Sequence, residues 1–295
     1  MNFRPLIVIA GPTATGKSDI AIKLAKAING VIINADSRQI YKEMRIGTAR
    51  PSDEQVQQVP HYLYGTVSVK DPYNIYEYQK DVFKLLETIP EVQTPILVGG
   101  TGLYIDCVIY NYNLKSQSEM DIDNERRNKL AKLSIEELQK QIPKDILERL
   151  NNSDKNNPRR LQRIIERGSM STDNQEKKEA FPCKYFVLGL PSDVLKGRIE
   201  KRVDQMIKNG LIEENKRLRE EELDKYPACN SIGYSEFAGY FENEKTIGEV
   251  KDEIVTNTMH YVKRQRTWFK RNKNAIYTTE FDLILKESEN LLKNS

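Results

Sequence analysis

The sequence contains few of the residues that build metal centres and disulfide frameworks. Among its 295 residues, three are cysteine, two are histidine and one is tryptophan. Cys107, Cys183 and Cys229 lie far apart and form no C-x-x-C pair, so neither a zinc site nor a disulfide framework is indicated, and we expect buried thiols. His61 and His260 have no spacing typical of a shared metal.

Long apolar runs are also missing. The stretch from Leu6 to Ala10 is among the longest, far below the ~20 residues that a membrane-spanning helix needs. Charged residues make up 30% of the chain and the mean hydropathy is -0.64, which indicates a soluble protein. Because a strand-like segment starts within the first residues, no room is left for a signal peptide. We therefore expect a cytoplasmic protein that does not associate with membranes.

The chain carries little net charge, +3, and this total says nothing about nucleic acid. The distribution of charge says more. One basic stretch lies near one face of a predicted helix and contains Arg159, Arg160, Arg163 and Arg167. A second lies between Glu253 and Glu280, where acidic residues are absent, and combines Lys263, Arg264, Arg266, Lys270, Arg271 and Lys273 with Tyr261, Trp268 and Phe269. Such clusters suit a phosphate backbone. The alternative for each is a solvated helix face, with Trp268 and Phe269 in the core.

Apolar runs and helical spacing alternate along the chain. Residues 6–10, 31–33 and 95–98 are predicted strands, and Ala21, Leu24, Ala25 and Ile28 form one apolar face of a predicted helix. This alternation predicts an α/β fold: a parallel sheet flanked by helices, of the doubly wound P-loop NTPase-like kind.

The character of the chain changes in its middle third. Residues from about 115 are polar and charged, with helical spacing at Leu130, Leu133, Leu138 and Ile142, and strand character returns at residues 185–190. We therefore predict an α/β core formed by residues 1–114 and 183–295, and an all-helical insertion domain at 115–182.

One motif connects the first predicted strand to the first predicted helix. It fits G-x-x-x-x-G-K-[ST] in full and consists of Gly11, Pro12, Thr13, Ala14, Thr15, Gly16, Lys17 and Ser18. Its backbone N–H groups and the helix N-terminus favour a phosphate, Lys17 supplies a positive charge, and Ser18 is a candidate Mg²⁺ ligand. The motif predicts a diphosphate or triphosphate ligand without distinguishing between them.

The strand that carries an acidic Mg²⁺ ligand in many NTPases has no such residue here. Residues 96–98 lead instead into Gly99-Gly-Thr101-Gly102, which suits close approach by a ligand. Asp36, after the second strand, is the carboxylate best placed near the phosphates, since open α/β sheets bind ligands at the carboxyl ends of their strands. The alternative is that Asp36, with Ser37, caps a helix.

Several motifs together indicate a family. They are Gly11–Ser18, Ala35-Asp-Ser-Arg-Gln-Ile-Tyr41, Gly47-Thr-Ala-Arg-Pro51, Gly99-Gly-Thr-Gly-Leu-Tyr104, Asn157-Pro-Arg-Arg-Leu161, Ser231-Ile-Gly-Tyr234 and Lys263-Arg-Gln-Arg-Thr-Trp268. In this order, over nearly the whole chain, the sequence resembles the bacterial tRNA dimethylallyltransferases, also called tRNA isopentenyltransferases or the IPP transferase family. It departs from their pattern at Tyr62, Glu77 and Asp81, which affects the expected shape of the prenyl pocket.

The resemblance implies an enzyme that transfers a prenyl group from dimethylallyl diphosphate to the exocyclic amine of the adenosine 3′-adjacent to the anticodon. It implies Mg²⁺ as cofactor and a tRNA anticodon stem-loop gripped by the insertion, with the base flipped out of the loop. The catalytic residues would be Asp36 as general base, Thr101 and Arg198, with Arg202 a second candidate for the diphosphate. The residues implied to contact tRNA are Asp36, Ser37, Arg38, Gln39, Thr101, Arg126, Arg159, Arg160, Leu161, Gln162, Arg163, Lys263 and Arg266.

Three other functions share some of these features. They are an ATP-dependent small-molecule kinase, a prenyltransferase that acts on free adenine nucleotides, and a non-enzymatic RNA-binding protein whose nucleotide only switches its conformation. The basic clusters argue against the first two. A monomer is the default expectation.

Overall fold

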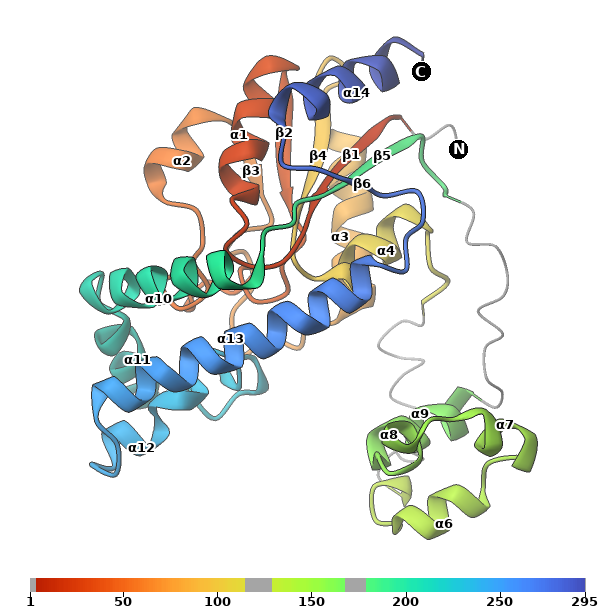
Figure 1. Cartoon of the computed structure of the whole chain (residues 1–295), viewed down its shortest axis with the longest axis vertical. Coiled ribbons are helices and arrows are strands. Elements are labelled where there is room, and N and C mark those ends of the chain that lie inside the picture. The colour runs from red at the N-terminus through yellow and green to blue at the C-terminus, as the bar shows by residue number, and fades with distance from the viewer. Residues whose placement is uncertain (1–3, 115–128, 168–178, 295) are drawn as a thin grey trace. The chain divides into compact units, whose positions relative to one another are not determined.

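The computed structural model describes residues 4–114, 129–167 and 179–294 of the chain (Figure 1). Two compact units divide it: residues 1–112 with 179–295, and residues 113–178. The boundaries expected from the sequence were 1–114 with 183–295, and 115–182. Each unit is described below by itself.

The first unit is built on a parallel sheet of six strands, which confirms the predicted fold class. Their order across the sheet is β3-β2-β4-β1-β5-β6. In that order they span His61–Tyr62, Gly30–Asn34, Thr94–Gly99, Leu6–Ala10, Cys183–Val187 and Ile276–Tyr277. The register pairs Val8 with Leu97 on one side and with Tyr185 on the other. Every residue of β1, β2 and β4 is buried, as expected for parallel strands covered on both faces.

Helices cover the sheet. They are α1 (Lys17–Ala27), α3 (Ile75–Thr88), α4 (Gly102–Ile109) and α14 (Phe281–Lys293), with a short α2 (Asp53–Gln58). The apolar face predicted for α1 is confirmed, because Ala21, Leu24 and Ala25 pack against Ile7, Ile9 and other strand residues in one core. Cys107 of α4 is buried, as is Cys229, whereas Cys183 is half-buried, and all three are free thiols.

A second helical layer lies beneath the carboxyl ends of the strands (Figure 1). It contains α10 (Ser192–Lys208), α11 (Leu211–Glu220), α12 (Ala238–Phe241), α13 (Ile247–Phe269) and two 3-10 turns, η1 (Pro227–Cys229) and η2 (Ser235–Phe237). Leu195, Ile199 and Val203 recur every four residues on α10, so they share one face and pack against α13 in a common core. This packing sets α10 and α13 beside the loops that follow β1, β2 and β4.

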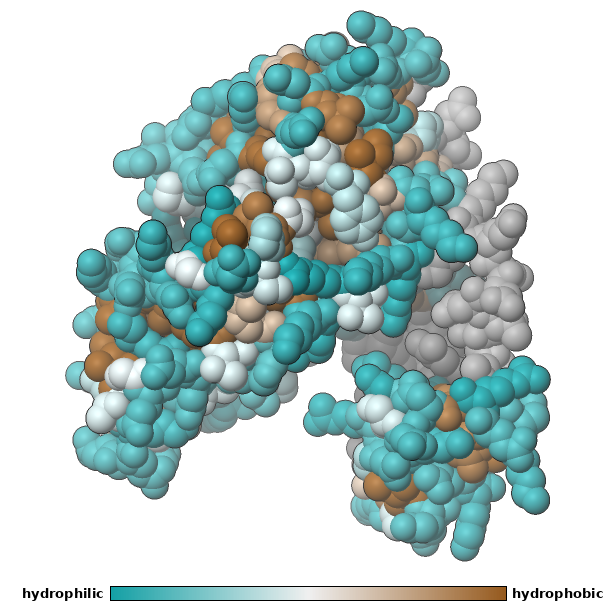
Figure 2. Space-filling model, viewed as in Figure 1, coloured by the Kyte–Doolittle hydropathy of each residue, from teal (hydrophilic) through white to brown (hydrophobic). Residues whose placement is uncertain are grey.

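The second unit is helical in its described residues. It contains α6 (Ile135–Lys140), α7 (Lys144–Arg149), α8 (Asn152–Lys155) and α9 (Pro158–Arg167). Leu130, Leu138 and Ile142 are buried in its small core and Leu133 packs against it. The spacing therefore predicted which residues are buried, but Leu133 and Ile142 lie in turns on either side of α6, so the four residues do not form one helical face. Figure 2 shows hydrophilic side chains over most of the visible face of each unit.

No helix within the described residues is both long enough and apolar enough to cross a membrane.

Candidate active site

The predicted phosphate-binding segment forms a tight loop between β1 and α1. Gly11 has φ +143°, and a Cβ there would lie 2.4 Å from the carbonyl oxygen of Leu188, so only glycine fits. Gly16, with φ +88°, directly precedes α1, which begins at Lys17. The unpaired N–H groups at the start of this helix give the loop its attraction for an anion.

Side chains from α10 and α13 hold this loop. The Thr13 N–H donates to Oε1 of Gln265 at 3.0 Å, and Nε2 of Gln265 donates to the Gly100 carbonyl at 2.9 Å. Gln265 therefore ties the loop after β1 to the loop after β4. Arg202 donates to Oγ1 of Thr13 at 3.1 Å, and Arg198 approaches the Ala14 carbonyl at 3.4 Å.

Lys17 lies in a poorly hydrated environment inside the loop. Its Nζ donates to the Pro12 carbonyl at 2.7 Å. Burial lowers the pKa of Lys17 to about 7, and the nearby Arg202 adds to that effect while Asp36 opposes it. An anion bound beside Lys17 would favour the charged ammonium.

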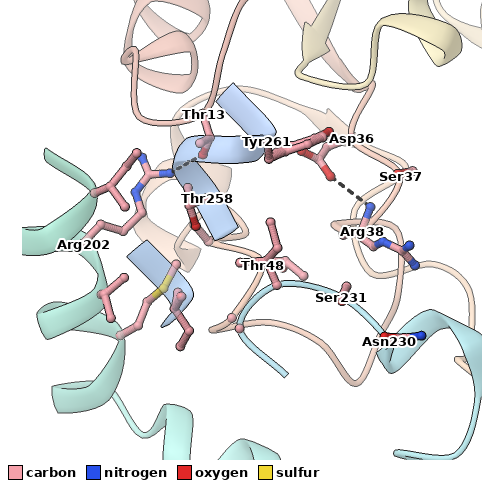
Figure 3. A pocket seen from close by; sticks show the side chains of 18 of the residues that line it. Thr13, Asp36, Ser37, Arg38, Thr48, Arg202, Asn230, Ser231, Thr258 and Tyr261 are labelled. Carbon is pink, nitrogen blue, oxygen red and sulfur yellow. Dashed lines mark hydrogen bonds between the residues drawn. The ribbon is translucent and has the colours of Figure 1, made fainter. Parts of the chain in front are cut away.

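Two cavities meet at this place. The first, which we call the loop cavity, has a volume of about 210 Å³ and is lined by Lys17, Ser18, Asp19 and other residues around the phosphate loop. The second, which we call the main cavity, has a volume of about 330 Å³ (Figure 3). Both cavities are lined by Thr13, Asp36, Thr48, Ala49 and Arg202, so these five residues mark the junction.

The main cavity has a polar side and an apolar side. Its polar lining includes Asp36, Ser37, Arg38, Asn230, Ser231, Tyr261 and Arg264. Its apolar lining comes mostly from α10 and α13 and includes Ile199, Val203, Met206, Ile232 and Ile254. A ligand with a flat polar part and a short hydrocarbon part matches this division.

Asp36 lies at the junction and is fixed by its neighbours. The Asp36 N–H donates to Oδ1 of Asn34 at 2.8 Å, and Nδ2 of Asn34 donates to the Asp36 carbonyl at 3.0 Å. One carboxylate oxygen accepts from the Arg38 N–H at 2.9 Å, as Figure 3 shows. Residues 37–40 form a turn, so the alternative that Asp36 caps a helix is wrong. The carboxylate closes a turn and still borders both cavities.

Thr101 lies behind Ser37. Its Oγ1 accepts from the Ser37 N–H at 3.0 Å and donates to Oγ of Ser37 at 3.3 Å. Thr101 also hydrogen-bonds Tyr261, whose pKa burial raises to about 12, so the Tyr261 hydroxyl stays protonated at neutral pH. Thr101 is absent from the linings of both cavities, so it contacts the site through Ser37 and Tyr261.

The three residues after Asp36 line different cavities. Ser37 and Arg38 line the main cavity, and Arg38 donates to the Ala228 carbonyl at 3.1 Å. Gln39 lines the loop cavity, where its Nε2 donates to the carbonyls of Thr48 and Ala49 at 2.9 and 3.1 Å. Its side-chain amide is thus engaged with the chain itself.

The two basic stretches also divide into different environments. On α9, Arg159, Arg160 and Arg163 are exposed, and Arg160 pairs with Asp154. The side chain of Leu161 is buried in the core of its unit, and Gln162 donates to the Leu130 carbonyl at 3.3 Å. The side chain of Leu161 therefore offers no surface to RNA in this structure. Arg126 lies outside the described residues.

On α13, Lys263 is exposed, whereas Arg266 donates to Oγ of Ser192 at 2.7 Å and to the Leu190 carbonyl. Arg266 thus joins α13 to the start of α10. Phe269 is buried, and Nε1 of Trp268 donates to a carboxylate oxygen of Asp106 at 3.2 Å. The solvated-face alternative is correct in placing Phe269 in the core, whereas Trp268 is only partly buried. It is incomplete for the basic residues, because Arg264 lines the main cavity.

Several of these residues were not identified from the sequence. Gln265 lies inside the Lys263–Trp268 motif, but it is uncharged, so the charge pattern does not distinguish it. Asn230 directly precedes the Ser231–Tyr234 motif. Tyr261 was expected only as part of the second basic stretch, and its hydrogen bond with Thr101 was not foreseen. The positions where the chain departs from the family pattern, Tyr62, Glu77 and Asp81, line neither cavity among the described residues.

A model of the family described as IPP transferase matches residues 39–272. The tRNA dimethylallyltransferase of Clostridioides difficile (strain 630) is 38% identical over 304 residues, which cover 100% of this chain and 96% of that relative. That of Streptococcus pyogenes serotype M6 is 36% identical, covering 93% and 90%. Both relatives are matched over nearly their full length.

Solved structures give a similar result. The tRNA delta(2)-isopentenylpyrophosphate transferase of Staphylococcus epidermidis has a TM-score of 0.73 at 29% identity, over 99% of this chain and 100% of that one. The full-length tRNA isopentenylpyrophosphate transferase of Bacillus halodurans has a TM-score of 0.72 at 31% identity, over 98% and 96%. A eukaryotic dimethylallyltransferase acting on tRNA has a TM-score of 0.71 at 26% identity, over 90% and 69%.

Proposed function

This chain belongs to the IPP transferase family, and we propose that it transfers a dimethylallyl group from dimethylallyl diphosphate to the exocyclic amine of the adenosine 3′-adjacent to the anticodon in tRNA. Its relatives named tRNA dimethylallyltransferase support this function over a kinase or an RNA-binding switch. The observation that carries the proposal is the junction of the two cavities at Asp36.

The loop cavity would hold the diphosphate of the donor. The N-terminal amides of α1 and the side chains of Lys17 and Arg202 would donate to the phosphate oxygens. Ser18, with Asp19 beside the same cavity, offers the oxygen ligands that Mg²⁺ prefers. Bound Mg²⁺ would neutralise charge on the diphosphate oxygens, and the residues around it would keep the leaving group in place.

The main cavity would hold the two parts that react. The dimethylallyl chain fits the apolar side, against Ile199, Val203 and Ile254, while the flipped adenine fits the polar side near Ser37 and Arg38. Because both sides open on the junction, the allylic carbon and the exocyclic amine would meet beside Asp36. Holding both reactants in this way lowers the entropic barrier of the reaction.

The reaction requires three coupled changes. The allylic carbon–oxygen bond breaks, and its electron pair leaves with the diphosphate; the amine nitrogen bonds to the carbon; and the amine loses a proton. Asp36, whose second carboxylate oxygen is not engaged by the Arg38 N–H, would accept that proton. Charge that develops on the leaving diphosphate would be stabilised by Lys17 and Arg202, as preorganised cations do in other enzymes.

The second unit would contribute a surface for the RNA. Arg159, Arg160 and Arg163 are exposed on α9, where guanidinium groups can contact the phosphates of the anticodon stem-loop. Lys263 would add a contact from α13, and Arg126 remains a candidate from the sequence. We further propose that the enzyme acts as a monomer in the cytoplasm, where its tRNA substrate is available.

One incubation tests this function. The protein is mixed with Mg²⁺, dimethylallyl diphosphate, unmodified tRNA and AMP, and the nucleosides are examined by mass spectrometry. We expect the added prenyl mass on a tRNA adenosine and none on AMP. Prenylation of AMP alone, or phosphoryl transfer to a small molecule when ATP replaces the allylic diphosphate, would overturn the proposal.

A further inference from the structure

A buried carboxylate on α11 has no place in the reaction described above. The side chain of Glu214 is only 8% exposed. Three consecutive backbone N–H groups, those of Arg45, Ile46 and Gly47, donate to its two oxygens at 2.9 to 3.0 Å. The Tyr234 hydroxyl donates to the same carboxylate at 2.7 Å.

Such a carboxylate is costly to bury unless its oxygens are satisfied. Four donors meet this need, and hydrogen bonds to an ionised acceptor are stronger than those between neutral groups. Arg50 lies close enough for attraction between its charge and that of Glu214. The ionised form of Glu214 therefore fixes the backbone of residues 45–47 in one conformation.

The segment that Glu214 holds forms one rim of the main cavity. Gly47 lines that cavity, and the next two residues, Thr48 and Ala49, line both cavities. A further contact holds Thr48 and Ala49, because the carbonyls of both residues accept hydrogen bonds from Nε2 of Gln39. Displacement of residues 45–47 would therefore move atoms that border the place of reaction.

The same helix also holds an adjacent rim. Asn215, the next residue on α11, donates to the Gly233 carbonyl at 3.1 Å. Gly233 lines the main cavity together with Asn230 and Ser231. The two rims pack directly, because a Cβ on Gly47 would lie 2.6 Å from the ring of Tyr234. α11 thus connects two loops that are nearly 190 residues apart in the chain.

We infer that Glu214 is a positioning residue for the RNA acceptor: through Tyr234 and residues 45–47, it fixes the packing of the two adjacent rims that border the main cavity, where the base would bind. This inference rests on the proposed function. It assigns no contact with substrate to Glu214. The donor's diphosphate is held mainly by the phosphate loop, which Gln265 and Arg202 support independently of Glu214. Loss of the carboxylate should therefore affect tRNA more than the donor.

The experiment compares Glu214→Gln, Tyr234→Phe and the matched control Glu213→Gln, an exposed residue on the same helix. In Glu214→Gln, the side-chain amide would face backbone N–H groups, so donors would meet donors. We expect kcat/KM for tRNA to fall by about 10- to 100-fold, the range for hydrogen bonds to a charged group. Tyr234→Phe, which removes one hydroxyl and keeps the ring, should lower it by about three- to tenfold.

Three further readouts separate positioning from loss of folded protein. The Kd for dimethylallyl diphosphate, measured without tRNA, should stay within about twofold of wild type, and the control variant should match wild type throughout. Gly47→Ala, which pushes against the Tyr234 ring from the other side, should give the same selective loss. If Glu214→Gln does not fold, the Tyr234→Phe and Gly47→Ala variants decide the question.

Two results would overturn the inference. One is an unchanged kcat/KM for tRNA in folded Tyr234→Phe and Gly47→Ala. The other is an equal loss of donor affinity and tRNA kinetics, which would assign Glu214 to general stability. An inactive wild-type enzyme with the same tRNA would instead contradict the proposed function, so the two failures are distinguishable.

Discussion

The ionisation of Lys17 should couple donor binding to proton uptake. Burial lowers the pKa of Lys17 to about 7 in the ligand-free protein. A diphosphate bound beside Nζ favours the ammonium form and raises that pKa. Above pH 7 the complex therefore holds more protons than the free protein, so affinity must fall as the pH rises.

The size of the effect follows from the pKa. If the complex keeps Lys17 charged, affinity scales with the charged fraction in the free protein, which is about nine tenths at pH 6 and about one tenth at pH 8. The Kd for dimethylallyl diphosphate should rise by about tenfold over this range beyond the contribution of the ligand's own ionisation. Near pH 8, about one proton should be taken up per molecule bound.

Calorimetry in two buffers of different ionisation enthalpy measures both quantities. Lys17→Arg is the matched control, since arginine stays charged throughout this range and the ligand's ionisation is common to both proteins. Lys17→Gln serves if the larger side chain does not fit. The same pH dependence in wild type and Lys17→Arg, or no proton uptake at pH 8, would contradict the coupling of donor binding to Lys17 ionisation.

Three further predictions concern the donor, the prenyl chain and the RNA. Arg202→Ala should weaken dimethylallyl diphosphate binding by about 10- to 100-fold, and exposed Arg198 should matter less; equal Kd values for the two variants would contradict this. Met206 lines the main cavity and also a neighbouring cavity of about 420 Å³, so Met206→Ala should raise the rate with geranyl diphosphate relative to dimethylallyl diphosphate by at least about tenfold. An unchanged ratio in competition assays would place the prenyl chain elsewhere. Replacing Arg160 and Arg163 with Ala should reduce the salt slope of tRNA binding by about 0.7 to 0.9 per lost phosphate contact, with donor affinity unchanged. An unchanged slope would leave both residues as a solvated helix face.

The parts of the fold that could be predicted from the sequence are those whose sequence pattern lies within a few consecutive residues. The run at 6–10, the glycines of the phosphate loop and the apolar face around Leu24 are each defined within a few residues, and the structure contains β1, the loop and α1 at these places. The edge strands β3 and β6 have two residues each, too few for a pattern of alternation. Their presence depends on pairing with β2 and β5, which is a property of the folded sheet.

The site could be predicted from the sequence less well than the fold, because the hydrogen bonds that organise it join residues far apart in the chain. Gln265 meets the Thr13 N–H across 252 residues, and Glu214 meets Gly47 across 167. A glutamine and a glutamate in helices resemble ordinary surface residues in the sequence. Only the packing of α11 and α13 against the loops makes them acceptors of buried N–H groups.

The positions of basic residues in the sequence also do not show which of them are exposed to solvent and which hold helices together. Arg266 belongs to a basic stretch, yet its guanidinium joins α13 to Leu190 and Ser192. Leu161 lies between exposed arginines on α9 and is fully buried. A helix turns about 100° at each residue, so one step along the chain moves a side chain from solvent to core.

We propose that Asp36, at the junction of the two cavities, takes the proton from the attacking amine. Asp36→Asn keeps the turn, because an amide oxygen can still accept from the Arg38 N–H, but it cannot take a proton. General bases contribute about 10²- to 10⁴-fold, or about 3 to 5 kcal/mol of the barrier. The measurement is the single-turnover rate of Asp36→Asn, with separate Kd values for tRNA and dimethylallyl diphosphate. We expect a rate at least about a hundredfold lower, with both Kd values near wild type. A rate within a few-fold of wild type would contradict it, and a matching loss of donor affinity would show that Asp36 acts chiefly on the diphosphate or its metal.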